Sequence, residues 1–592
     1  MRLAAFLALA LCGVLDASPQ TRYGQLLLAG GHLPVCSSVS PANCRHRVDW
    51  PAMAMTGRAF EVKPGSVRRL QKILREEMHD RRGEQIVLAL MQLNRRMSGP
   101  VTLQAFQREF RALDFTVALP ARKAQAERAV SIDGENIYQG LADRHWNAIL
   151  DHMEIPAVDP SGRRRIEYVD VEASSSRAAI GIYTRFVEMA RAASGRTRPR
   201  IAISTAASRD PYEAIDYYRG IFEQLGAEVI WLPLDAAVSQ ARKAGQCEDL
   251  ATWQVRVLAA FERNRIDPQR FALQQQFCSE KNAGKRLLEN VDGLFLNGGD
   301  QWLTLNSFGP ADAREVEFET LSRRAESRRM VIGGTSAGTA VQSSGVMISN
   351  GAAATALAQR GRAHPPPSPG CERDDSCPKG LGSGSLTWQA GGGLATFPLG
   401  VLDTHFSQRN RQFRLLKLQA LTGQRFGWGI DETTALEISF PDNQTNWLLR
   451  IHGAGNVWMI DTGQAEIRST HPLQITDVLV ARLTSGSQHR FTPHGGLNDH
   501  HADAFTTHSR LPDQKPAGCR TIKHFDAFDT KMDASLKQQN AEACVPISTA
   551  GGTFFWRMKA IPPPGESGGG NPAGLYKVSA GFAEPRKNRT PD

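Results

Sequence analysis

The segment from Met330 to Thr339 constrains the fold of this 592-residue chain more than any other. It begins as an apolar run typical of a buried strand, which breaks at two glycines just before Ser336. The five residues Gly334-Thr335-Ser336-Ala337-Gly338 form a Gly-x-Ser-x-Gly motif, in which glycines allow a serine to occupy a tight strand-to-helix corner. We therefore expect Ser336 to be an exposed nucleophile, with the N–H of Ala337 directed at a developing oxyanion. An ordinary Gly/Ser turn is the alternative.

Segments typical of strands and of helices alternate around this corner. Strands are predicted near 26–30, 200–205, 228–232 and 291–297, and helices near 178–193, 211–225 and 311–327. This alternation predicts an α/β fold with a doubly wound, mostly parallel sheet flanked by helices. Functional sites of such sheets lie at the carboxyl ends of the strands. Ser336 and the segment Gly298-Gly299-Asp300-Gln301 both follow such ends.

The chain is too long for one hydrophobic core, so we expect several parts. Residues 1–17 are predicted to be a signal peptide, and 18–35 to hold the first strand of the catalytic domain. A mainly helical insertion is expected at 36–170. The catalytic domain would occupy 171–480, with insertions near 235–286 and 361–393. A β-rich C-terminal extension is predicted, with 481–592 irregular apart from a strand near 575–582.

Export is indicated by the N-terminus and by the cysteines. The apolar run after Met1-Arg2 is too short to cross a bilayer, and no other run reaches the required length, so no membrane span is expected. Eight cysteines remain after removal of the signal peptide, and an even count in an exported chain favours disulfides. Neighbours along the chain are the simplest pairing: Cys36 with Cys44, Cys247 with Cys278, Cys371 with Cys377, and Cys519 with Cys544. The predicted location is secreted or periplasmic.

Nucleic acid, metal and cofactor are not expected. The net charge of +10 is spread along the chain without a long basic tract, which argues against nucleic-acid binding. The chain has no Cys-x-x-Cys spacing of the kind that predicts a zinc site. Five histidines crowd the C-terminal region at positions that match no defined metal site: His489, His494, His500, His501 and His508.

His405 is the candidate general base for Ser336. It follows the next apolar strand, in Asp403-Thr404-His405-Phe406, so in a parallel sheet it would reach the same edge. A neutral imidazole there would take the hydroxyl proton and return it to the leaving amine. A basic helix carrying Arg409, Arg411 and Arg414 is expected to follow.

Four motifs occur in the order found in one peptidase family. They are the segments 298–301 and 334–338, the segment 403–406 with its three arginines, and Gly429-Ile430-Asp431-Glu432. In these motifs the chain resembles cyanophycinases, serine peptidases with a class I glutamine amidotransferase-like α/β fold. The resemblance covers about 26–30 and 175–480.

The resemblance implies hydrolysis of the β-aspartyl-arginine polymer cyanophycin, or of a similar peptide. Ser336 would be the nucleophile and His405 the general base, with the N–H groups of Ala337 and Gly299 as oxyanion donors. Further residues would line or brace the substrate site: Gln301, Asp403, Arg409, Arg411 and Arg414. No cofactor is implied, and a homodimer stays open.

The chain departs from the family pattern at two points. Thr404 stands where cyanophycinases usually have glutamine, and the histidine-orienting glutamate that we expect after the nucleophile is missing, since 337–371 holds no acidic residue. Asp403 or Glu432 is then the candidate support for His405, with Glu432 as the third catalytic residue. Two alternatives remain: a related aspartyl or isoaspartyl exopeptidase, and a catalytically inactive polymer-binding homologue. An α/β-hydrolase esterase would leave the other motifs unexplained.

Overall fold

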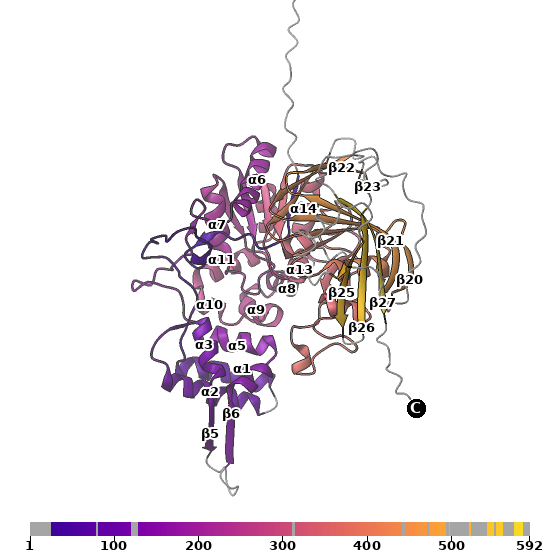
Figure 1. The fold of residues 1–592 in the computed structure, drawn as a ribbon. Helices are drawn as coiled ribbons and strands as arrows, with labels where there is room; N and C mark the ends of the chain where they lie inside the picture. Colours follow the sequence, from indigo (N-terminus) through magenta and orange to yellow (C-terminus); the bar gives the residue numbers. More distant parts are fainter. Residues whose placement is uncertain are drawn as a thin grey trace, which may run out of the picture.

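A computed structural model describes most of the chain (Figure 1). The described residues are 25–78, 81–119, 128–310, 314–440, 446–470, 473–492, 496–497, 520–521, 542–549, 552–560 and 574–583. The predicted signal peptide at 1–17, Cys519 and four of the five C-terminal histidines lie outside them. Within the described ranges, no helix combines the length and apolar character that crossing a bilayer requires.

The main sheet has five parallel strands at one side and antiparallel strands at the other. Its order is β23-β22-β18-β17-β1-β11-β10-β8-β9. The parallel strands are β1 (Leu26–Ala29), β11 (Val331–Thr335), β10 (Gly293–Leu296), β8 (Arg200–Ser204) and β9 (Glu228–Leu232). The antiparallel strands are β17 (Thr434–Ser439), β18 (Trp447–Gly453), β22 (Gln488–Thr492) and β23 (Gly496–Leu497). In β1 every residue is buried, as expected of a strand covered on both faces.

Helices cover both faces of the parallel strands. On one face, Phe186 and Phe222 pack against Phe295 of β10. They belong to α6 (Arg177–Ser194) and α7 (Ile215–Gln224). The other face packs against α8 (Ala236–Ala244), α13 (Gln301–Phe308) and α14 (Val316–Glu326). The chain therefore has a mixed α/β fold with a parallel-strand sheet and many helices.

A second sheet holds most of the C-terminal part. It runs in the order β15-β16-β19-β21-β27-β26-β25-β24, with β20 beside β21. Its strands are β15 (Val401–Thr404), β16 (Phe426–Ile430), β19 (Asn456–Asp461), β20 (Glu466–Thr470), β21 (Leu473–Thr484), β24 (Arg520–Thr521), β25 (Glu542–Thr549), β26 (Gly552–Ala560) and β27 (Gly574–Ala583). The C-terminal region is β-rich, as predicted. Among the described residues of its last part, the predicted strand near 575–582 is β27, and β25 and β26, which were not predicted, continue the antiparallel ladder from β21 through β27.

The strand before His405 belongs to this second sheet. β15 pairs in parallel with β16 and does not join the strand of Ser336. The expectation that His405 approaches Ser336 along a shared parallel sheet was therefore wrong. The basic segment also differs from the expectation, because α17 runs over Gln412–Thr422 and begins only after Arg409 and Arg411.

Residues 38–168 form a helical layer with a core of its own (indigo to purple in Figure 1). Its helices are α1 (Pro64–Glu77), α2 (Arg82–Arg96), α3 (Leu103–Arg111), α4 (Gly134–Gln139) and α5 (Asp143–Met153). Short strands complete it: the pair β3 (Ala59–Phe60) and β4 (Val101–Thr102), and the hairpin β5 (Asp114–Leu119) and β6 (Arg128–Asp133). Its two ends are held together by β2 (Cys36–Ser37) and β7 (Val169–Asp170). Leu70, Phe106 and Phe110 of its helices are fully buried.

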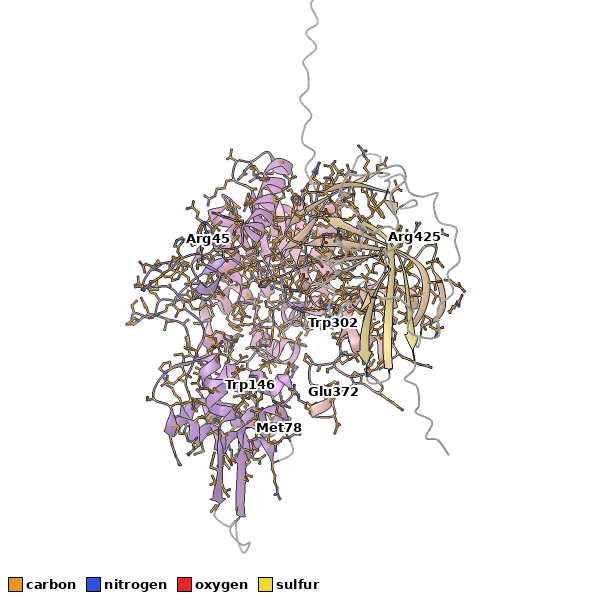
Figure 2. The ribbon with its side chains drawn as sticks, viewed as in Figure 1. Arg45, Met78, Trp146, Trp302, Glu372 and Arg425 are labelled. Carbon is orange, nitrogen blue, oxygen red and sulfur yellow. A yellow bond between two sulfur atoms is a disulfide. The ribbon has the colours of Figure 1, made fainter. Side chains whose placement is uncertain are left out.

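Two further segments connect the helical layer to the rest. One follows α8 and contains α9 (Leu250–Leu258), α10 (Arg263–Ile266), α11 (Pro268–Ser279) and α12 (Ala283–Glu289). The other contains β12 (Met347–Asn350), α16 (Ala353–Ala358), β13 (Arg362–Ala363) and β14 (Thr387–Gln389). Its loop touches the helical layer, where Arg373 Nη1 donates to the Leu141 carbonyl oxygen at 2.9 Å. Figure 2 shows the adjacent Glu372 at this edge, near Trp146.

Three of the predicted disulfides are formed. They join Cys36 to Cys44, Cys247 to Cys278, and Cys371 to Cys377. The fourth predicted pair includes Cys519, so it lies outside the described residues. Bonded cysteines offer no thiolate, so the grouping of Cys371, Glu372 and Cys377 is not a metal site.

Candidate active site

Ser336 occupies a strained corner between β11 and the short helix α15 (Ala337–Ala340). Its backbone has φ 53° and ψ −116°, a conformation that a non-glycine residue rarely adopts. The Ser336 N–H donates to the Ala29 carbonyl oxygen at 3.0 Å, and the Thr339 hydroxyl donates to the same oxygen at 2.8 Å. Gly338 is required because an added Cβ would lie 2.2 Å from the Leu296 carbonyl oxygen. The corner is thus fixed by β1 and β10, and it leaves the serine partly exposed.

His405 reaches Ser336 from the end of β15. Its Nε2 lies 2.8 Å from Ser336 Oγ, which is hydrogen-bonding distance. The His405 N–H donates to the Gly30 carbonyl oxygen at 2.8 Å, so the end of β1 holds the histidine backbone as well as the serine corner. The imidazole ring packs on Gly31, where an added Cβ would lie 2.3 Å from the ring. The strand β1 therefore brings the two sheets together at this point.

Glu432 supplies the carboxylate beside His405. Its Oε1 lies 2.6 Å from His405 Nδ1, so Nδ1 carries the proton and Nε2 is free to accept the serine proton. The neighbouring Asp431 is buried and accepts hydrogen bonds from the Ser407 N–H at 3.0 Å and its hydroxyl at 2.6 Å. This contact ties the turn after His405 to the turn that carries Glu432. Of the two candidate supports for the histidine, Glu432 makes the contact and Asp403 does not.

The surroundings keep the imidazole neutral at neutral pH. Burial lowers the pKa of His405 below its ordinary value, and the positive charges of Arg409 and Arg411 lower it further. The hydrogen bond from Nδ1 to Glu432 opposes this decrease. A neutral imidazole whose Nε2 faces a serine hydroxyl has the chemistry of a general base.

The two candidate oxyanion donors come from different segments near Ser336. Ala337 is the first residue of α15. Gly298, next to Gly299, packs on the serine, since an added Cβ there would lie 3.4 Å from Ser336 Cβ. Gly299 has φ +142° and lies against Ala207, whose carbonyl oxygen would be 2.2 Å from an added Cβ. Only glycine fits at 299.

A largely buried charge cluster lies next to His405. It consists of Asp403, Arg411 and Arg414. Arg414 binds the Asp403 carboxylate with both Nε (2.7 Å) and Nη2 (2.5 Å). Arg411 Nη1 donates to the Thr404 carbonyl oxygen at 2.8 Å and lies 3.5 Å from Asp403 Oδ1. Burial and the neighbouring Arg414 cation lower the pKa of Arg411 to about 9, so it remains protonated at neutral pH. One carboxylate thus faces two cations.

The remaining predicted residues are separated from this cluster. Gln301 begins α13, and its Nε2 donates to the Ile348 carbonyl oxygen of β12 at 2.8 Å. Arg409 is exposed in the turn between β15 and α17. The structure therefore brings together Ser336, His405 and Glu432, sets Asp403 with two arginines beside them, and leaves Arg409 at the surface.

Sequence reasoning missed the part played by the end of β1. Gly30-Gly31 was interpreted only as the end of a strand, yet it holds His405 on one side and the 431–433 turn on the other. The sequence did offer a signal for the role of Gly30-Gly31. The other glycine pair at a strand end, Gly298-Gly299, belongs to one of the four motifs of the site. Asp431 lies in the Gly429-Ile430-Asp431-Glu432 motif, whereas Ser407 left no comparable signal.

Comparison with known proteins finds cyanophycinases among the relatives of this chain. No family model matches the chain. Over 300 residues it is 24% identical to a cyanophycinase of Nostoc sp. (strain PCC 7120 / SAG 25.82 / UTEX 2576), an alignment covering 50% of this chain and 76% of the relative. Over 306 residues it is 24% identical to a cyanophycinase of Geminocystis herdmanii (strain PCC 6308), covering 51% of this chain and 85% of the relative. This chain is similar to cyanophycinases. The predicted resemblance is confirmed.

A solved structure of a peptidase from an acI-B1 actinobacterium also aligns with the chain. The alignment covers 53% of this chain and 91% of that protein, with 17% identity and a TM-score of 0.28. A score this low carries no argument about the cyanophycinase-like fold. The contacts of Ser336, His405 and Glu432 therefore stand on the chain's own geometry.

Proposed function

We propose that this chain is a secreted serine peptidase of the cyanophycinase type, which cleaves cyanophycin to β-Asp-Arg dipeptides. One observation carries the proposal: the hydrogen-bonded series Ser336 Oγ, His405 Nε2, His405 Nδ1 and Glu432 Oε1. The similarity to cyanophycinases supports a peptidase acting on this polymer. The three disulfides are compatible with an extracellular or periplasmic location.

The proposed reaction passes through an acyl-enzyme. Ser336 Oγ attacks the scissile carbonyl carbon while its proton passes to His405 Nε2. The C–N bond then breaks, and the leaving amine takes that proton from Nε2. A water molecule loses a proton to Nε2 as its oxygen attacks the ester carbon; the bond between that carbon and Ser336 Oγ then breaks, Oγ takes the proton from Nε2, and the acid product leaves. Throughout, Glu432 holds Nδ1–H and stabilises the imidazolium that forms twice per turnover.

The negative oxygen of each tetrahedral intermediate needs donors that are already in place. In this proposal the N–H groups of Ala337 and Gly299 supply them. Both belong to backbone that is fixed before substrate binds, Ala337 by the strained Ser336 corner and Gly299 by its contact with Ala207. Donors that need no rearrangement stabilise the transition state most effectively.

The charge cluster suits an acidic substrate. Arg411 shares the single Asp403 carboxylate with Arg414, so the cluster has an excess positive charge beside the histidine. A substrate carboxylate would balance that charge, and a guanidinium binds carboxylates with two parallel hydrogen bonds. We assign Arg411 to the substrate carboxylate, and Asp403 with Arg414 to bracing Arg411.

A related aspartyl or isoaspartyl exopeptidase is the second candidate. It is favoured by Thr404, which precedes the base and packs its hydroxyl oxygen 3.5 Å from Arg411 Nη1. The usual glutamine of the family would extend further at this position. A short side chain beside the proposed carboxylate site would change which acidic peptide fits.

A substrate panel and an active-site probe test the proposal together. The panel contains purified cyanophycin, α-aspartyl peptides and β-aspartyl peptides of equal length. We expect a fluorophosphonate to label Ser336 and cyanophycin to be cleaved with the highest kcat/KM. Labelling with cleavage of the short peptides alone would favour the exopeptidase. Absence of both labelling and cleavage would indicate the inactive homologue.

A further inference from the structure

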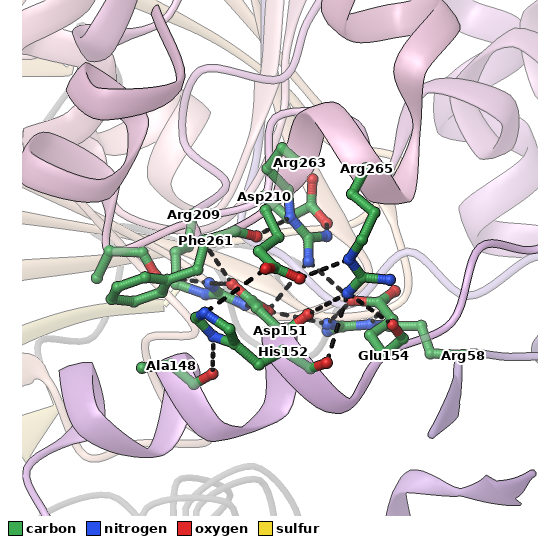
Figure 3. A network of polar contacts seen from close by, with 12 residues as sticks. Arg58, Ala148, Asp151, His152, Glu154, Arg209, Asp210, Phe261, Arg263 and Arg265 are labelled. Atoms are coloured by element: carbon green, nitrogen blue, oxygen red, sulfur yellow. Dashed lines mark hydrogen bonds and ion pairs between the residues drawn. The ribbon is translucent and has the colours of Figure 1, made fainter. Parts of the chain in front are cut away.

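A buried group of charges joins the helical layer to the α/β domain (Figure 3). Three of its arginines and three carboxylates pair with one another and balance in charge: Arg58, Arg209, Arg263, Asp151, Glu154 and Asp210. A fourth arginine, Arg265, donates to the carbonyl oxygens of Asp151 and Glu154 and pairs with Glu262. Arg263 is 1% exposed and its partner Asp151 is 0% exposed. A balanced, hydrogen-bonded group of this kind is sensitive to the loss of any one member, because the partner is left charged and buried.

Asp151, on α5 of the helical layer, is the centre of the group. Its Oδ2 accepts hydrogen bonds from Arg209 Nη1 at 2.7 Å and from the Phe261 N–H at 2.8 Å. Its Oδ1 lies 3.1 Å from Arg209 Nη2 and 3.2 Å from Arg263 Nη2. Arg209 Nη1 also donates to the Ala259 carbonyl oxygen at 2.7 Å. Arg209 is therefore held from two sides, by the Ala259 carbonyl oxygen and by the Asp151 carboxylate of the helical layer.

Arg209 belongs to the loop that supports Gly299. Two residues before it, the Ala207 carbonyl oxygen accepts a hydrogen bond from the Asp300 N–H at 2.8 Å. The Ala207 N–H donates to Asn297 Oδ1 at 3.1 Å, and Asn297 Nδ2 donates to Ser208 Oγ at 2.8 Å. The loop at 207–209 is thus hydrogen-bonded to the segment 297–300 on one side and ion-paired to the helical layer on the other.

We infer that the helical layer positions the segment 297–300, which carries the Gly299 N–H donor of the active site. Asp151 is the positioning residue, and it acts through Arg209 on Ala207 and Gly299. The inference rests on the proposed function for the role of the Gly299 N–H. The helical layer thereby supports catalysis, although it carries no residue of the active site itself. Asp151 touches no reacting atom in this account.

The physical basis is the short distance along the chain between Arg209 and Ala207. If Arg209 loses its anchor, the peptide groups of 207 and 208 are free to shift, and Gly299 packs directly on Ala207. A displacement of about 1 Å in a positioned group lowers a rate by up to about 100-fold. Loss of one oxyanion donor altogether costs about 100- to 1,000-fold in kcat.

The test compares two buried carboxylates changed to the isosteric amide. Asp151→Asn removes the charge that anchors Arg209 and keeps the shape of the side chain. Glu317→Gln is the matched control, since Glu317 is 0% exposed and pairs with Arg242 on α8, away from the 207–209 loop. Each full-length variant is examined for urea unfolding, kcat and KM on cyanophycin, the rate of Ser336 phosphonylation by a fluorophosphonate, and hydrogen exchange of the Asp300 amide.

We expect Asp151→Asn to lower kcat by about 10- to 100-fold with KM changed less than about threefold. The phosphonylation rate should fall by a similar factor, because that reaction uses the same oxyanion site. The Asp300 amide, which is bonded to Ala207, should exchange faster. Glu317→Gln should lose stability without any of these three changes.

A loss of stability in Asp151→Asn with phosphonylation and Asp300 exchange within about twofold of the parent would overturn the inference. If Asp151→Asn does not fold, Arg209→Lys keeps the charge balance, breaks the two-point contact, and is judged by the same readouts. Phosphonylation and amide exchange require no peptide substrate. A parent that cleaves no substrate would thus refute the proposed function, while these two readouts still decide the inference.

Discussion

The smallest feature on which the site depends is the space between Gly31 and His405. Gly31 has φ +112°, a region that side chains with a Cβ rarely occupy, and the imidazole ring fills the position where that Cβ would lie. The ring is therefore placed between Gly31 and Ser336, with Glu432 at its other nitrogen. At this scale, the reactivity of Ser336 is a question of where one imidazole lies.

Gly31→Ala should displace the imidazole and lower kcat by about 100-fold or more, because the ring must move away from the new methyl group. The measurement is kcat on cyanophycin, normalised to folded protein. Gly162→Ala is the control, since Gly162 also has positive φ (+81°) but has nothing within 4 Å of an added Cβ. Equal activity losses in both variants would show that backbone strain alone is responsible.

Glu432→Gln should lower kcat by about 10⁴-fold, because the imidazolium loses its carboxylate and the tautomer is no longer fixed. The reaction needs neutral His405, so activity falls as the pH drops through the His405 pKa. The Glu432 hydrogen bond raises that pKa, so its loss should move the acid limb of the kcat/KM profile to lower pH.

Arg409→Gln should shift the acid limb of the kcat/KM profile in the opposite direction. The charge of Arg409 lowers the His405 pKa, so its removal should move the acid limb to higher pH. Shifts in the same direction for both variants would contradict the assignment of His405 as the titrating base.

At the scale of elements, α17 is held to the site by a buried ion pair. The side chains of Arg414 and Asp403 are 6% and 1% exposed, and Arg414 Nη1 also donates to the Gly351 carbonyl oxygen at 2.7 Å. The pair therefore joins α17, the end of β15 and the turn after β12. A buried pair of this kind specifies an arrangement rather than adding much net stability.

Asp403→Asn should lower the free energy of unfolding by about 3–5 kcal/mol, because it leaves Arg414 and Arg411 buried without an anion. Urea unfolding of the two proteins measures the change. Glu466→Gln is the control, since its pair with Arg468 lies at the surface, and we expect no measurable change in its urea midpoint. An Asp403→Asn variant as stable as the parent would show that the arginines are compensated elsewhere.

The elements predicted from the sequence are those that local patterns determine. The Ser336 corner follows from glycines within two residues of the serine, and the three observed disulfides join neighbours along the chain. The mainly helical character predicted for 36–170 is likewise local, and in α1 the apolar residues Val67, Leu70 and Leu74 are buried while Ile73 is partly exposed.

The predictions that were wrong or missing concern contacts between segments that are distant in the sequence. The sheet that β15 joins is decided by β16 and β19, more than 20 residues later, and no pattern within β15 reveals it. The strand predicted near 575–582 is β27, but β25 and β26 were missed, and Pro546 interrupts the apolar pattern of β25. Arg409 and Arg411 precede α17 because the chain turns before the helix begins.

At the scale of the whole molecule, buried charges hold the helical layer onto the α/β domain, and disulfides close loops within the added segments. The bridge between Cys247 and Cys278 spans 31 residues, whereas that between Cys371 and Cys377 spans 6. A longer closed loop removes more conformational freedom from the unfolded chain. The bridge between Cys247 and Cys278 should therefore contribute more to stability.

Replacing Cys247 and Cys278 together by alanine should lower the free energy of unfolding by about 3.5 kcal/mol, against about 2 kcal/mol for the pair at 371 and 377. Urea unfolding of the two double variants beside the parent gives the comparison. The opposite order would show that native contacts, rather than loop length, set the contribution of these bridges.

The central claim is that Ser336 makes this chain a cyanophycin-degrading peptidase. The most direct measurement is mass-spectrometric detection of β-Asp-Arg released from purified cyanophycin by the mature protein and by its Ser336→Ala variant. The account predicts dipeptide release by the parent and a loss of at least about 10⁴-fold in the variant. Equal release by both proteins would contradict the assignment of the nucleophile, and release by neither would contradict the assignment of the substrate.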